Sequence, residues 1–176
     1  MAPSTVVNLQ EKIIDVPDFP KPGIVFKDIT PILLDPESMR SMVDQFAESI
    51  DLPIDKIAAV ESRGFLIGAP LAHRLGTGLV LIRKKGKLPR KTIQQGYGLE
   101  YGEDIIEVQE GDLNSGDRVM IIDDVLATGG TAHATELVCK TAGAEVIGFR
   151  FLMNLKFLNG EQKLTAPIQS LIDYDD

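Results

Sequence analysis

The sequence contains no tryptophan, and aromatic residues make up only 6% of its 176 residues. The core must therefore consist mainly of aliphatic side chains, which agrees with the frequent runs of Ile, Leu, Val and Ala. Hydrophobic residues account for 44% and charged residues for 25%, as in globular proteins and unlike disordered ones. A chain of this length predicts one domain over residues 1–176.

Cysteine occurs once, at Cys139, so a disulfide within the chain is impossible. The apolar, helix-like pattern around it indicates a buried and unreactive thiol. The sequence has no apolar run long enough to span a bilayer. Its first residues also lack the basic start and apolar centre of a signal peptide. We therefore expect no membrane association and a cytoplasmic location.

Positive charge is scarce and unevenly distributed. The chain has 18 Lys and Arg against 26 Asp and Glu, and its net charge of −8 disfavours non-specific binding to nucleic acid. A single segment nevertheless contains one third of the basic residues. This segment is either a solvated loop or a binding site for a small polyanion. Its basic residues are Arg83, Lys84, Lys85, Lys87, Arg90 and Lys91.

Short apolar runs alternate with helical patterns along most of the chain. Strands are expected at 56–60, 78–83, 104–109, 118–123, 145–153 and 168–172. Helices are expected at 4–14, 35–50, 64–76 and 131–142. This alternation predicts an α/β fold with a mostly parallel central sheet and helices on both faces.

Turn and cap residues mark the boundaries of several elements. Asp35 and Pro36 are typical of the first positions of a helix. Gly143 predicts a left-handed helix end. The segment 17–23 contains three prolines and a glycine, which predicts irregular backbone. The polar, glycine-containing segment 84–104 predicts a long loop.

Ligands of such sheets bind beyond the carboxyl ends of the strands. The residues that directly follow the apolar runs are therefore the candidates for a functional site. Three segments qualify: 61–64, the basic loop after Arg83, and 123–131.

The segment VMIIDDVLATGGTA, at 119–132, has the pattern of a phosphate-binding strand–loop–helix. Consecutive glycines let the backbone N–H groups approach an anion, and the N-terminus of the following helix adds further N–H groups. The hydroxyls of Thr128 and Thr131 are additional donors. The segment lacks the Lys of a P-loop and the G-x-G-x-x-G spacing of a dinucleotide site.

Asp123 and Asp124 precede this loop and suit the other end of a sugar phosphate, because carboxylates accept hydrogen bonds from ribose hydroxyls. Two acidic residues after an apolar strand, followed by A-T-G-G-T, resemble the phosphoribosyl pyrophosphate (PRPP) motif of the type I phosphoribosyltransferases. The resemblance implies the fold of that family and PRPP binding by both aspartates and by the loop. The loop residues are Ala127, Thr128, Gly129, Gly130 and Thr131.

Four further segments are similar to the adenine phosphoribosyltransferases. They lie at 19–33, 61–72, 82–92 and 99–102. The resemblance implies a small hood over the base, formed by residues 1–34.

Within the hood, the resemblance implies that main-chain groups of Val25 and Lys27 read the edge of adenine. Phe26 would lie beside the ring, and Leu155 would pack on the base from the other side. Many members of the family have Arg at the position of Lys27, which matters little if backbone atoms make the contact. Read without the resemblance, Phe26 is equally an ordinary core residue.

The same resemblance implies that Arg63 binds the pyrophosphate from the turn at 61–64, where the family often has an unusual peptide conformation. A surface salt bridge is the alternative role for Arg63. Segment 84–104 would be a mobile catalytic loop that brings Lys87 to the pyrophosphate. Arg83 would approach the PRPP of a neighbouring subunit in a homodimer. Glu100 would be the catalytic carboxylate near purine N7, and otherwise it is a solvated loop residue.

The resemblance thus implies transfer of the phosphoribosyl group from PRPP to adenine, which gives AMP and pyrophosphate. His73 and His133 lack neighbours at ligand spacing, so the sequence indicates no metal site built from side chains. The resemblance implies Mg²⁺ that arrives with PRPP, whose oxygens would supply most of its ligands. Two alternatives stay open. The enzyme could use hypoxanthine, guanine, xanthine or orotate, or the chain could be a PRPP-sensing regulator without activity.

Overall fold

The computed structural model describes residues 7–99 and 102–176, and its centre is a sheet of seven strands in the order β5-β6-β4-β3-β7-β8-β9. The five strands from β4 to β9 in this order are parallel, and β6 and β5 continue the sheet as an antiparallel hairpin. The parallel strands are β3 (Lys56–Val60), β4 (Gly78–Lys84), β7 (Arg118–Leu126), β8 (Glu145–Leu155) and β9 (Ile168–Tyr174). The hairpin strands are β5 (Thr92–Leu99) and β6 (Gly102–Gln109).

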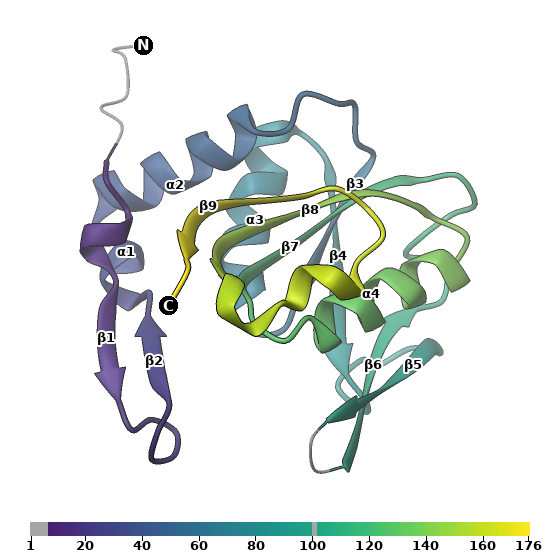
Figure 1. Ribbon diagram of the computed structural model, residues 1–176. Coiled ribbons are helices and arrows are strands. Elements are labelled where there is room, and N and C mark those ends of the chain that lie inside the picture. The colour runs from purple at the N-terminus through teal and green to yellow at the C-terminus, as the bar shows by residue number, and fades with distance from the viewer. Residues whose placement is uncertain (1–6, 100–101) are drawn as a thin grey trace.

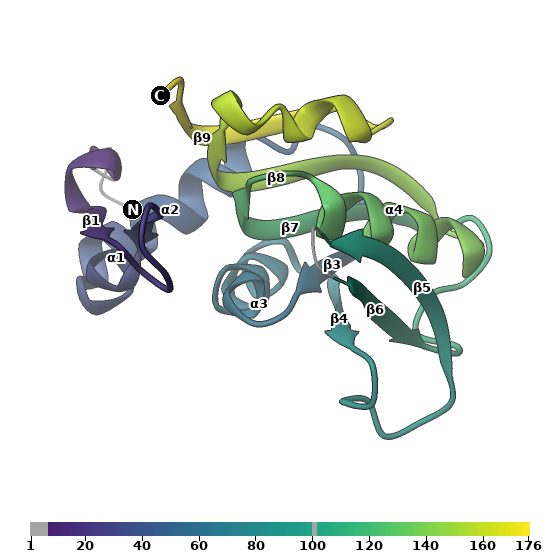
Figure 2. The same ribbon diagram turned by 60° about the horizontal axis from the view of Figure 1, so that its bottom comes forward.

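Helices cover both faces of this sheet, as the alternating pattern predicts (Figure 2). Successive residues of β7 point to opposite faces. Val119 and Ile121 therefore pack in the cluster that contains α4 (Gly130–Thr141), whereas Met120 and Ile122 pack in the cluster with α2 (Pro36–Glu48) and α3 (Arg63–Leu75). The continuous apolar character of β7 follows from burial on both faces.

The predicted helix boundaries at Asp35 and Gly143 are confirmed. The carboxylate of Asp35 accepts a hydrogen bond from the backbone N–H of Glu37 at 3.3 Å, and Pro36 starts α2. Gly143 has φ of +94°, the left-handed conformation that ends α4. Within α4, Cys139 is buried, and burial raises the pKa of its thiol to about 12. The thiol is therefore protonated at neutral pH, as expected of an unreactive cysteine.

Two predictions about secondary structure are wrong. The expected helix at 4–14 is replaced, over its described residues, by a 3-10 turn η1 (Gln10–Lys12) and the start of strand β1 (Ile14–Pro17). The expected loop at 84–104 is largely the hairpin of β5 and β6. Ile93 and Tyr97 alternate with exposed residues and pack against the core, so a period of two lies within this polar segment.

The first strands form a small sheet of their own. β1 pairs with β2 (Val25–Asp28) in an antiparallel ribbon that stands beside the main sheet (Figure 1). The segment that connects β1 to β2 is irregular, as predicted. The short helices α1 (Thr30–Leu34), η2 (Lys156–Leu158) and η3 (Gly160–Lys163) have no counterpart in the sequence prediction. No helix in the described ranges combines the length and apolarity needed to cross a membrane.

Candidate active site

A pocket of about 440 Å³ opens at the carboxyl ends of β3 and β7. All three segments expected from the strand ends contribute to its lining: the turn after β3, the segment from β7 into α4 and, from the segment after Arg83, Lys84, Tyr97 and Asp104. Strand β4 and the hairpin supply further walls. The expected site residues in the lining are Arg63, Asp123, Asp124, Ala127, Thr128, Gly129, Gly130 and Thr131.

The loop between β7 and α4 has the geometry of an anion site. Gly129 has φ of +77°, and α4 begins at Gly130, so free backbone N–H groups of the helix start face the pocket. The loop lies against Gly160 at the start of η3. A Cβ atom on Gly160 would lie 2.8 Å from the backbone nitrogen of Gly129 and would overlap the carbonyl oxygen of Ala127. This close approach fixes the outer side of the loop.

The two aspartates lie on β7 itself, because the strand extends to Leu126 and does not end at Asp123 as predicted. Nε of Arg63 donates to Oδ2 of Asp124 at 2.5 Å, across 61 residues of sequence. Burial raises the pKa of Asp123, and the negative charge of Asp124 raises it further. The turn after β3 fits closely here, since a Cβ on Gly64 would lie 3.0 Å from Oδ1 of Asp123.

Glu61 gathers the basic residues at the rim of the pocket. Its carboxylate accepts hydrogen bonds from Nε of Arg83 at 3.0 Å, from the backbone N–H of Lys84 at 2.9 Å and from Nζ of Lys87 at 2.7 Å. Burial opposes ionisation of Glu61, but these donors outweigh it and hold its pKa below the usual range. Arg83 and Lys87 are thus brought to the site through Glu61, and the peptide between Glu61 and Ser62 is cis.

The hairpin adds three lining residues that the sequence reasoning missed, Tyr97, Asp104 and Ile106. Nζ of Lys84 pairs with Asp104 at 2.7 Å. The hydroxyl of Tyr97 lies 3.3 Å from Oδ2 of Asp104 and 3.4 Å from Oγ1 of Thr131, so it links the hairpin to the phosphate loop. The period of two at Ile93 and Tyr97 is the signal that could have placed Tyr97 on a strand facing the site.

The four residues expected at the base do not line this pocket. Phe26 approaches it through Arg63, and the other three lie on β2 and at the end of β8. The guanidinium of Arg63 lies 4.9 Å from the ring centre of Phe26, which joins the β1–β2 ribbon to the site. Nζ of Lys27 donates to Asp15 at 2.8 Å and lies 4.3 Å from the ring of Tyr174.

Tyr174 is also the strand partner of Leu155. Tyr174 thus adjoins Leu155 in the sheet and has Lys27 over its ring, at the end of β8 that faces the ribbon. Val25 lies on β2, and half of its surface is exposed. Glu100 lies outside the described residues.

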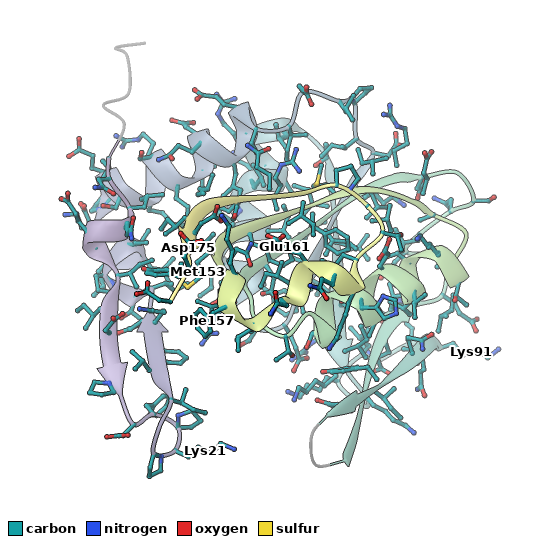
Figure 3. The ribbon with its side chains drawn as sticks, viewed as in Figure 1. Lys21, Lys91, Met153, Phe157, Glu161 and Asp175 are labelled. Carbon is teal, nitrogen blue, oxygen red and sulfur yellow. The ribbon has the colours of Figure 1, made fainter. Side chains whose placement is uncertain are left out.

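The basic residues of segment 83–91 do not form one continuous surface. Arg90 and Lys91 pair with Asp112 and Glu110 on the far side of the hairpin. The side chain of Lys91 extends away from the body of the molecule (Figure 3). Within the described ranges, no three His, Cys, Asp or Glu side chains are grouped closely enough to hold a metal ion.

The site combines two aspartates near the end of a parallel strand, a glycine-rich loop at the start of the next helix and a guanidinium beside the aspartates. This arrangement suits the binding of a phosphorylated ribose. Together, this fold and this site define a phosphoribosyltransferase. A family model described as "Phosphoribosyl transferase domain" matches residues 34–164.

Known proteins similar to this chain are adenine phosphoribosyltransferases. One from Carboxydothermus hydrogenoformans is 49% identical over 96% of this chain and 100% of its own length. The crystal structure of another, from Thermoanaerobacter pseudethanolicus, has a TM-score of 0.94 and 45% identity over 97% of this chain and 100% of that one. The Saccharomyces cerevisiae enzyme, complexed with adenine and an imino-altritol bisphosphate, has a TM-score of 0.91 and 39% identity over 93% of this chain and 96% of that one. The chain belongs to the phosphoribosyl transferase family, among its adenine phosphoribosyltransferases.

Proposed function

We propose that this chain transfers the 5-phosphoribosyl group of PRPP to adenine at the pocket on β3 and β7, forming AMP and releasing pyrophosphate. One observation carries the proposal: Asp123 and Asp124 share a pocket with the Ala127–Thr131 loop. Carboxylates for ribose hydroxyls thus adjoin an N–H-rich socket for a phosphate. A related structure supports it, since the crystal structure of the Trypanosoma brucei enzyme contains AMP, pyrophosphate and ribose 5-phosphate.

The loop holds the 5-phosphate, a part of PRPP that does not react. Each charge-assisted hydrogen bond there contributes roughly 1.5–3 kcal/mol. This binding energy positions the anomeric carbon, which gains positive charge as the bond to pyrophosphate breaks. Asp123 and Asp124 favour that charge and hold the ribose hydroxyls.

Arg63 and Lys87 stabilise the departing pyrophosphate. In the structure described here, both cations are paired with carboxylates, Arg63 with Asp124 and Lys87 with Glu61. Pyrophosphate oxygens replace these partners as PRPP binds, so neither cation enters the reaction unpaired. Mg²⁺ would be held mainly by the oxygens of PRPP and by waters, and it would neutralise charge on the leaving group.

Adenine lies between the ribbon and the end of β8. Main-chain groups of Val25 and Lys27 read its edge, Phe26 lies beside the ring and Leu155 packs on the other side. The side chain of Lys27 is already engaged by Asp15 and Tyr174, which supports recognition through backbone atoms. Glu100 lies at N7 and accepts its proton as general base while N9 attacks the anomeric carbon; in the reverse reaction the same carboxyl group returns the proton as general acid. The contribution is roughly 10²–10⁴ in rate.

The active form is a homodimer in which Arg83 approaches the PRPP of the neighbouring copy. Leu66 on α3 and Leu79 on β4 support this, since both apolar side chains are exposed, by 48% and 38%. A cytoplasmic location, expected from the sequence, is part of the same proposal. The molar mass in solution tests the dimer.

A panel of bases tests the reaction. Purified protein with Mg²⁺ and PRPP is mixed in turn with adenine, hypoxanthine, guanine, xanthine and orotate, and nucleotide and pyrophosphate are measured. We expect AMP from adenine alone, its loss when Mg²⁺ is chelated, and a drop of roughly 10²-fold or more in Glu100→Ala. Turnover of another base would overturn the adenine site at Val25–Lys27. Tight PRPP binding without any turnover would favour a regulator.

A further inference from the structure

Glu107 is a buried carboxylate outside the residues assigned so far. It lies on β6, between Arg83 of β4 and Gln94 of β5, and is only 2% exposed. Burying a charge in this way is unfavourable unless hydrogen bonds replace the lost water. Glu107 accepts four, so its burial is compensated.

The four donors all come from the segment that connects β4 to β5 and from β5 itself. Oε1 accepts from the backbone N–H groups of Gly86 at 3.0 Å and Leu88 at 3.3 Å. Oε2 accepts from Oγ1 of Thr92 at 3.0 Å and Nε2 of Gln94 at 3.1 Å.

The two backbone donors flank Lys87 on either side. Between them, the backbone carbonyl of Lys87 accepts a hydrogen bond from Nη1 of Arg83 at 3.2 Å. Nζ of Lys87 donates to Oε1 of Glu61 at 2.7 Å. Oε1 of Glu107 thus fixes the turn from which the Lys87 side chain extends to the pocket rim. Gly86 has φ of +83°, a left-handed conformation that favours glycine, so the turn has a specific backbone shape.

We propose that Glu107 is a positioning residue that sets the turn around Lys87 so that the ammonium group of Lys87 reaches the pyrophosphate end of the pocket. The proposal rests on the PRPP-binding role given above to Lys87. It predicts that Glu107 affects the binding of PRPP and does not affect the binding of adenine.

Kinetics of two variants test the proposal. Glu107→Ala removes both oxygens, and we expect the KM for PRPP to rise roughly ten- to hundredfold, because a displacement of about 1 Å has effects of that size. The KM for adenine stays unchanged. Glu107→Gln retains one oxygen for the N–H groups of Gly86 and Leu88, while Thr92 and Gln94 can reorient to accept from its amide. We expect this variant to keep the wild-type KM for PRPP.

Asp117→Ala is the matched control. Its carboxylate also holds a loop, through the backbone N–H of Asn114 at 2.8 Å and Lys56 at 2.8 Å, but at the start of β7, away from the pocket. Loss of stability alone lowers the amount of active protein and leaves both KM values unchanged, as expected for this variant. Equal KM values for PRPP in Glu107→Ala and wild type would overturn the proposal, as would a rise in Glu107→Gln as large as that in Glu107→Ala.

Amide hydrogen exchange gives a readout that does not depend on activity. Protection of the Gly86 and Leu88 amides should be lost in Glu107→Ala and kept in Glu107→Gln. The double variant Glu107→Ala with Lys87→Met should have the same KM for PRPP as Lys87→Met alone, because both changes remove the same contact of Lys87 with PRPP. If Lys87→Met does not affect PRPP, the role of Lys87 is wrong. If it does and the double variant is further impaired, the role of Glu107 is wrong.

Discussion

Single residues shape this site partly by the side-chain atoms they lack. Gly64 leaves room for the carboxylate of Asp123, and Gly160 leaves room for the backbone of Ala127 and Gly129. At these positions even a methyl group would meet fixed atoms, because its neighbours are backbone or a buried carboxylate. Such positions influence ligand binding without touching a ligand.

Replacing Gly160 with Ala tests this point. The new methyl group must displace the Ala127–Thr131 loop, and we expect the KM for PRPP to rise roughly tenfold or more, with the KM for adenine little changed. Steady-state kinetics with each substrate varied in turn measure both values. Gly78→Ala is the control, since its Cβ would lie no closer than 3.5 Å to a neighbouring atom, in the flexible side chain of Lys56. An unaltered PRPP affinity in a folded Gly160→Ala protein would contradict the prediction.

Between elements, buried polar contacts join helices to the sheet. Arg150 on β8 is 8% exposed, and it donates to the hydroxyl of Ser49 at 2.9 Å and to its carbonyl oxygen at 2.6 Å, at the end of α2. A third hydrogen bond goes to the carbonyl of Phe149 at 2.9 Å. These contacts connect residues 101 positions apart and fix the end of α2 against the sheet.

Truncating Arg150 to Ala should lower the free energy of unfolding by about 3 kcal/mol, because buried acceptors lose charged donors. Denaturation by urea measures the change. Arg74→Ala provides the comparison, since Arg74 pairs with Asp44 at 3.2 Å but keeps half of its side chain exposed. That exposed pair should contribute no more than about 1 kcal/mol. Comparable losses in the two variants would show that burial of Arg150 does not matter.

For the whole molecule, ionised carboxylates couple stability to pH. Burial opposes ionisation at Glu61 and Glu136, but their hydrogen-bond donors outweigh it. At Asp117, the hydrogen bond from Lys56 favours the ionised carboxylate. The pKa of all three carboxyls is therefore lower than the usual 4.5 for Glu and 3.8 for Asp. Asp123 has the opposite shift, since burial and Asp124 raise its pKa.

A lowered pKa in the folded state means that the unfolded chain binds protons first as pH falls. The three carboxylates thus stabilise the fold above their unfolded pKa, and this contribution is lost as pH falls through the folded values. The raised pKa of Asp123 gives a change of opposite sign. We expect the Tm to fall steeply between about pH 5 and 3. Glu136→Gln should lessen that slope; an acid-independent Tm would rule out the coupling.

The sequence by itself determined the class of fold and the centre of the site. Strand β3, helix α2 and the β7–loop–α4 segment were predictable because apolar periodicity, caps and glycines act within a few residues of one another. Asp123, Asp124 and the Ala127–Thr131 loop are adjacent in the chain, so their common place in the pocket was also predictable. The family resemblance added the base and pyrophosphate residues.

Only the tertiary structure decided which distant residues meet. It paired Arg63 with Asp124, placed Glu61 against Arg83 and Lys87, and turned the expected 84–104 loop into a hairpin whose Tyr97 reaches Thr131. It also brought Glu107 to the turn around Lys87. These contacts depend on strand order and register, which are set by the packing of the whole sheet and leave no local pattern in the sequence.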